Sequence, residues 1–190
     1  MKKFVLSIFV LVVSLSFAGP ESIVFTDEQK KSSNDFVLAG DNSAADVLVD
    51  KNDTNTVLLA ARLFSEDVER VTGIKAQVKT SVKKTSPNYI IVGTIEKSIF
   101  ISTTVYDGKI DVSEVKGKWE SLVTQVVDNP FGKNKKALVI AGSDRRGAAY
   151  GLLEISKQMG VSPWYYFADV AVKKSDSVFV KSGRYVQKSP

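Results

Sequence analysis

Residues 137–160, "ALVIAGSDRRGAAYGLLEISKQMG", decide the fold class of this chain. The opening "ALVIAG" is a short apolar run typical of a buried strand, and the remainder predicts a helix over residues 144–159. Four apolar residues share one face of that helix: Ala148, Leu152, Ile155 and Met159. A buried strand that turns directly into an amphipathic helix indicates a sheet covered by helices.

The flanking sequence predicts the other elements. A second helix is expected from Val57 to Val71, with Thr54 or Asn55 at its start and Gly73 at its end. Segment 95–106 is compatible with either a strand or a short helix. The Gly-containing loop 131–136 indicates that the strands before and after this loop form an antiparallel pair. Strands are predicted at 22–25, 35–40, 45–50, 75–80, 89–94, 119–130, 137–142 and 177–180. The predicted fold is α+β, a mixed, largely antiparallel sheet with two main helices on one face.

The N-terminus predicts a secretory signal peptide. A basic "MKK" precedes an apolar segment, and the small residues Ser16 and Ala18 mark cleavage after Ala18. An uncleaved membrane anchor is the alternative, but the apolar segment is short for a membrane span. We therefore expect a secreted or periplasmic protein that is not held in a membrane after cleavage.

Composition excludes several kinds of chemistry. The chain has no cysteine and no histidine, which rules out thiol nucleophiles, cysteine-zinc sites and a Ser-His-Asp triad within it. Loss of Lys2 and Lys3 with the signal peptide leaves 24 basic against 21 acidic residues, a formal net charge of +3. So small an excess does not indicate nucleic acid as a partner.

The strand-to-helix turn carries the first candidate site, formed by Asp144, Arg145 and Arg146. Gly142 and Gly147 have the spacing of a phosphate-binding loop. Alanines nevertheless follow Gly147 where that loop needs a lysine and a hydroxyl residue, so the phosphate interpretation fails. The other interpretation is a junction in which Ser143 or Asp144 caps the helix, and Gly147 and Gly151, one turn apart, allow close packing.

The second candidate is the aromatic run "WYYF", Trp164 to Phe167. Four consecutive aromatic residues do not all face one core, so some are expected to contact a sugar or a partner surface. The alternative places two of them in the core and two over loops. The carboxylates of Asp144, Glu154 and Asp169 have no spacing that marks a glycosidase pair.

Taken together, several ordered motifs resemble the N-terminal domain of glycoside hydrolase family 115, the secreted α-glucuronidases that act on xylan. They are "GSDRRG" followed by "YG", then S-x-Q-x-G-V-S-P-W-Y and ADV-x-V. Upstream, "AARLFSEDVERVTG", "IIVGTI" and "KGKWESLVTQVVDNP" follow the same order. The resemblance covers residues 22–180. It implies a fold like that of the small α+β domains that precede the barrel in hexosaminidases.

The resemblance also implies a domain organisation in which catalysis lies outside this chain. Residues 19–180 would form an accessory domain, and residues 181–190 a linker toward a catalytic (β/α)8 barrel that this chain lacks. Catalytic carboxylates would lie in that barrel, so no catalytic residue, metal or cofactor is assigned here. The chain alone is not expected to hydrolyse glucuronoxylan.

We expect the candidate residues to lie where the domain meets the barrel. They are Asp144, Arg145, Arg146, Trp164 and Tyr165. An arginine there can bind a uronate carboxylate through its planar fork. The alternative function is a free-standing carbohydrate-binding or protein-interaction module of the same fold.

Overall fold

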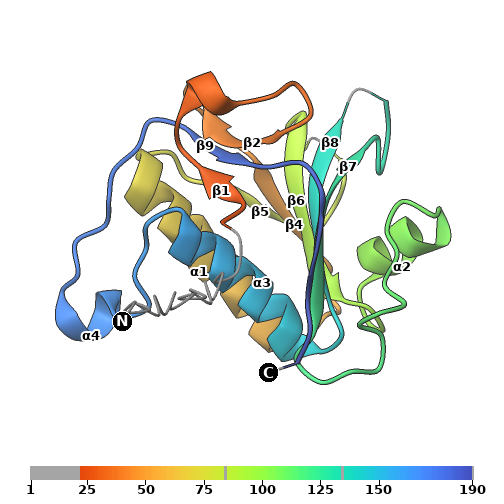
Figure 1. Ribbon diagram of the computed structural model, residues 1–190. Helices are drawn as coiled ribbons and strands as arrows, with labels where there is room; N and C mark the ends of the chain where they lie inside the picture. The colour runs from red at the N-terminus through yellow and green to blue at the C-terminus, as the bar shows by residue number, and fades with distance from the viewer. Residues whose placement is uncertain (1–21, 84, 134, 190) are drawn as a thin grey trace, which may run out of the picture.

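The computed structural model describes residues 22–83, 85–133 and 135–189, and the predicted signal peptide, residues 1–18, lies outside them. Figure 1 shows a larger sheet, a smaller sheet beside it, and two long helices. The helices are α1 (Asn55–Thr72), α2 (Ile99–Tyr106), α3 (Arg145–Gln158), the short α4 (Tyr165–Ala168) and a 3-10 turn, Glu28–Lys30. The strands are β1 (Val24–Phe25), β2 (Phe36–Gly40), β3 (Ser43–Ala44), β4 (Asp46–Val49), β5 (Val78–Lys79), β6 (Asn88–Thr94), β7 (Leu122–Asp128), β8 (Lys136–Gly142), β9 (Val178–Val180) and β10 (Arg184–Gln187).

The larger sheet has the order β10-β7-β8-β6-β4-β5, and the smaller sheet has the order β1-β9-β2-β3. Strands β5, β4, β6 and β8 pair in parallel, whereas β7 pairs antiparallel with both β8 and β10. Five of the eight strand pairs in the described residues are antiparallel. The prediction of a mixed, largely antiparallel α+β fold is confirmed.

Helices α1 and α3 lie side by side on one face of the larger sheet, as predicted (Figure 1). Their buried faces meet the sheet in the main core, which includes Val57, Phe64, Leu152 and Ile155. Gly73 ends α1 in a left-handed conformation with φ 77°, which glycine adopts without strain. Thr54 occupies the N-cap position, but its side chain makes no cap hydrogen bond.

Segment 95–106, left open by the sequence, contains helix α2. The Ser98 side chain caps it by accepting a hydrogen bond from the Ile101 N–H at 3.4 Å. Ile101 is fully buried in a second core on the other face of the sheet, with Leu48 and Ile91. The need to cover that face explains why a β-branched segment folds as a helix, since packing overrides local propensity.

The prediction of a linker at residues 181–190 is wrong for Arg184–Gln187, which form β10. This strand pairs with β7 along its whole length, from Arg184 opposite Gln125 to Gln187 opposite Leu122. Its sequence is polar because an edge strand buries little of its surface. The prediction at 75–80 shortens to the two residues of β5 for the same reason.

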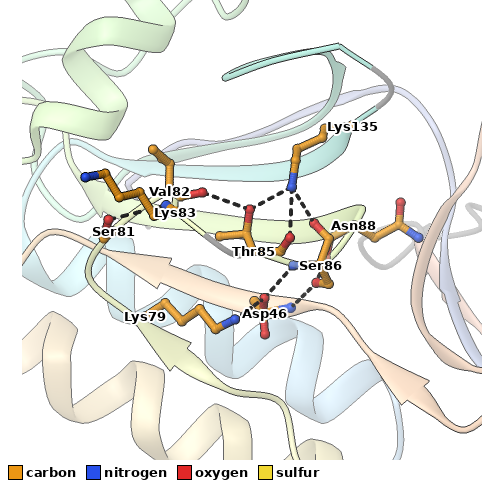
Figure 2. A network of polar contacts seen from close by, with 9 residues as sticks. All are labelled: Asp46, Lys79, Ser81, Val82, Lys83, Thr85, Ser86, Asn88 and Lys135. Atoms are coloured by element: carbon orange, nitrogen blue, oxygen red, sulfur yellow. Dashed lines mark hydrogen bonds and ion pairs between the residues drawn. The ribbon is translucent and has the colours of Figure 1, made fainter.

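A polar network holds the loop that enters β6 (Figure 2). The buried Asp46 carboxylate accepts the Ser86 N–H at 2.6 Å and pairs with the Lys79 ammonium at 2.9 Å. The Lys135 ammonium donates to the Thr85 carbonyl and hydroxyl, both at 2.9 Å, and to the Ser86 carbonyl at 3.1 Å. The network ties together β4, β5 and the loops before β6 and β8, so it stabilises the fold at the end of the sheet opposite the start of α3.

Candidate functional site

The candidate site lies where β8 turns into α3. Asp144 is the N-cap residue, and its Oδ1 accepts the N–H groups of Arg146 at 2.9 Å and Gly147 at 2.8 Å. Its Oδ2 accepts the Glu120 N–H at 2.9 Å, which ties the segment before β7 to the helix. Burial opposes the charge, but the hydrogen bonds from Glu120, Gly147 and Arg146 outweigh it and hold the pKa of Asp144 below its usual value.

Two further residues fasten the same junction. The Ser143 N–H and hydroxyl both donate to the Ser121 carbonyl, at 2.8 and 2.9 Å, and the Ser121 N–H donates back to the Ser143 Oγ at 3.0 Å. Gly147 packs directly against the Ser121 carbonyl group, because a Cβ at this position would lie 2.3 Å from the Ser121 carbonyl oxygen. The predicted role of the glycines in close packing is confirmed here and at Gly151, where a Cβ would lie 2.3 Å from the Ile140 Cγ2.

Glu120 and Trp119 are the site residues that sequence reasoning missed. The periodicity placed them on a strand, but β7 begins only at Leu122 and Glu120 has a left-handed φ of 50°. The nearly buried Glu120 carboxylate accepts from the Arg146 Nη1 at 2.7 Å, which raises the pKa of Arg146. The Arg146 guanidinium also lies 6.0 Å from the centroid of the exposed Trp119 ring, within reach of a cation–π contact. No local sequence pattern predicts that Glu120 adopts a left-handed backbone conformation.

The two arginines of the turn therefore differ. Arg146 is fixed by Glu120, whereas Arg145 is exposed and no hydrogen bond or ion pair of its side chain is found within the described residues. Arg145 is the guanidinium available to a partner or a carboxylate ligand.

Trp164 and Tyr165 lie away from this cluster. They begin α4, beyond the C-terminal end of α3, whereas Asp144 lies at the N-terminal end (Figure 1). A helix of 14 residues separates the two groups by roughly 20 Å at 1.5 Å per residue. Trp164 is 65% exposed and packs edge-on against Phe167, with ring centroids 6.4 Å apart. Tyr165 is half-buried beneath the Arg70 guanidinium at 5.1 Å.

The geometry limits the chemistry of the turn. The N–H groups of Arg146 and Gly147 in the first turn of α3 bind the Asp144 carboxylate, so these two are not open to a phosphate. Three backbone N–H groups hold the Asp144 carboxylate in its charged form, so Asp144 is not a ready proton donor. Within residues 22–83, 85–133 and 135–189, no group of three acidic side chains is placed to bind a metal, and no helix is long and apolar enough to cross a membrane.

A family 115 4-O-methyl-α-glucuronidase with specificity for decorated arabinogalactans is similar to this chain in both sequence and fold. The identity is 34% and the TM-score 0.65 over 81% of this chain. This confirms the resemblance to glycoside hydrolase family 115. The family 115-like domain spans only 18% of the length of that glucuronidase, so it corresponds to one part of a much larger enzyme.

More distant similarities were found to two hexosaminidases. A family 20 β-N-acetylhexosaminidase from Streptomyces coelicolor A3(2) shares 9% identity over 83% of this chain and 24% of its own, with a TM-score of 0.48. A β-hexosaminidase of Streptomyces plicatus gives 8% identity over the same shares and a TM-score of 0.47. Neither the family models nor the curated proteins compared with the chain gave a match.

Proposed function

We propose that this chain is a non-catalytic accessory domain of a secreted α-glucuronidase, and that it docks a catalytic (β/α)8 barrel. The observation that carries the proposal is the 34% identity over 81% of this chain, combined with its 18% share of the glucuronidase. We propose secretion through the signal peptide cleaved after Ala18. The expected substrate of the whole enzyme is glucuronoxylan, or another polysaccharide that carries (4-O-methyl)glucuronic acid.

The docking surface that we propose is the outer face of α1 and α3. The buried residues of both helices face the sheet, so exposed apolar residues on them face outward. They are Leu59 of α1 with Tyr150 and Leu153 of α3, each at least two-fifths exposed. A partner that covers these side chains would gain the free energy of removing their apolar area from water.

Charge and aromatic residues extend this outer helix face. The exposed Arg62 and Arg145 have no ion pair within the described residues, which favours a partner that offers carboxylates. Exposed Trp119 lies beside the start of α3, and Trp164 lies beyond its end. The predicted site residues at the two ends of α3 would belong to one interface only if the partner spans the whole helix.

A binding experiment tests the docking. The mature chain would be titrated by calorimetry into a family 115 catalytic barrel that lacks its own N-terminal domain. We expect Leu153→Glu to weaken binding at least tenfold, because a charge would enter a desolvated contact. Val82→Glu, at an exposed apolar position in the loop between β5 and β6, is the matched control and should bind normally.

Two results would contradict the proposal. One is equal binding by both variants, which would move the interface elsewhere. The other is release of glucuronic acid from glucuronoxylan or arabinogalactan by the mature chain alone, which would make the domain catalytic.

A further inference from the structure

A cavity of about 630 Å³ lies between the C-terminal half of α3 and strand β10. Helix α3 packs on β8, β7 and β6, whereas β10 lies one strand further out at the edge of the sheet. The helix-facing side of β10 is therefore left without a covering helix in the described residues. A volume of this size falls in the range of pockets that hold small molecules.

The walls of this α3–β10 cavity are apolar and include one aromatic ring. Leu122 of β7 and Ile155 of α3 contribute buried aliphatic side chains, and Tyr185 of β10 contributes its ring. The Tyr185 hydroxyl donates to the Ser182 carbonyl at 3.1 Å, which fixes the orientation of the ring. The C–H face of a pyranose packs well on an aromatic ring and on aliphatic side chains, because both surfaces are apolar.

Polar groups at the cavity suit the hydroxyls of such a ring. Thr124 is 4% exposed, lines the cavity, and makes no side-chain hydrogen bond within the described residues. The Gln187 side chain at the rim is exposed, and like Thr124 it makes no side-chain hydrogen bond in the part of the chain that the structure describes. A hydroxyl and a carboxamide offer both donors and acceptors, which is what vicinal sugar hydroxyls require.

The charged groups at the rim are paired. Arg184 also lines the cavity, and its guanidinium pairs with the Glu114 carboxylate at 2.9 Å. The Glu154 Oε2 pairs with the Lys157 ammonium at 3.4 Å, and its Oε1 accepts from the Gln158 Nε2 at 2.9 Å. The Gln158 Oε1 is occupied by the N–H groups of Ile23 and Val24, at 2.8 and 3.2 Å. A balanced rim with spare lone pairs on Glu154 favours an uncharged ligand over a phosphate or a uronate.

We propose that the α3–β10 cavity binds one neutral pyranose of a polysaccharide, as a non-catalytic anchor site. Tyr185 packs on the sugar face, while Thr124, Gln187 and Glu154 bind its hydroxyls. The inference rests on the proposed function only for the choice of test sugars. The cavity and the outer helix face are separate surfaces, so either can fail its test while the other passes.

The test is a titration of the mature chain, followed by amide chemical shifts in NMR, with xylotetraose and with β-1,3-galactotetraose. We expect saturable shifts at β10 and the end of α3 with at least one of them, at a Kd of about 1 mM. Inorganic phosphate should leave these amides unchanged. Absence of saturable shifts with both sugars would overturn the proposal, as would shifts confined to α4.

Two variants with a matched control locate the site. Thr124→Val keeps the side-chain shape and should weaken binding about five-fold through loss of one hydrogen bond. Glu154→Gln should weaken binding of the sugar, because the proposal has the Glu154 carboxylate bind its hydroxyls. Glu69→Gln on α1 is the control and should leave sugar binding unchanged, since Glu69 is also paired with a lysine, at 3.5 Å, but lies outside the cavity lining. Thermal unfolding shows whether Thr124→Val folds, and the exposed Gln187→Ala repeats the test if it does not. Unchanged binding in Glu154→Gln and in a folded cavity variant would exclude the cavity.

Discussion

Replacement of Asp144 by alanine separates a structural role of the β8–α3 turn from a role in binding. The carboxylate accepts three backbone N–H groups, from Arg146, Gly147 and Glu120, at 2.8 to 2.9 Å. Loss of the helix cap costs about 1 kcal/mol. The Glu120 N–H lies in a residue that is only 7% exposed, so leaving it unpaired costs about 2 kcal/mol more. We expect Asp144→Ala to lower the free energy of unfolding by about 3 kcal/mol.

Urea unfolding followed by tryptophan fluorescence measures this change. With a slope of about 2 kcal/mol per molar urea, the midpoint should fall by about 1.5 M. The control is Arg145→Ala, an exposed neighbour whose replacement should shift the free energy by no more than about 0.5 kcal/mol. If Asp144→Ala were as stable as this control, the carboxylate would not hold the junction, and a role in binding would be the better explanation.

The dependence on pH gives a second check on Asp144. Its pKa is lower in the folded chain than in the unfolded chain, so its contribution is present above the unfolded value of about 3.9. That contribution is lost as the pH falls through the folded value. The difference between the parent chain and Asp144→Ala should therefore be constant from pH 7 to about pH 5 and shrink below about pH 4. A difference that grew toward low pH would contradict the assigned direction.

Three further predictions concern other parts of the molecule. Gly147→Ala should destabilise by about 2 kcal/mol in urea unfolding despite better helix propensity, because its Cβ would lie 2.3 Å from the Ser121 carbonyl; a gain in stability would refute this. Asp35→Asn should flatten the fall in stability below about pH 4, since hydrogen bonds to Ser182 and Ser32 outweigh burial and lower the pKa of Asp35; an unchanged pH profile would count against it. Trp164→Ser combined with Phe167→Ser should leave stability within about 0.5 kcal/mol but reduce self-association in sedimentation, because both rings are exposed; a parent chain that is already monomeric would show that they drive no association.

Local patterns predicted the long elements well. Helices α1 and α3 and the β7–β8 hairpin follow from apolar spacing and from Gly73 and the Gly-containing loop, because these signals act within one turn or one hairpin. The same logic predicted a cap at Ser143 or Asp144, of which the structure has Asp144, and close packing at the glycines. It did not identify β10, since an edge strand is stabilised by its partner β7 and carries little apolar pattern of its own.

Three features depended on tertiary structure. The contact of Glu120 with Arg146 joins residues 26 positions apart, and it needs a left-handed backbone that no pattern marks. The separation of Trp164 from Asp144 follows from the length of a straight helix between them. The α3–β10 cavity exists only because the sheet extends one strand beyond the helix that covers it.

The sequence by itself therefore determined the family resemblance, the fold class and the capped turn, because motifs and helix periodicity are written in consecutive residues. Tertiary structure decided which surfaces remain open to partners. Exposure depends on which distant segments cover one another, and that is fixed only when the whole chain has packed.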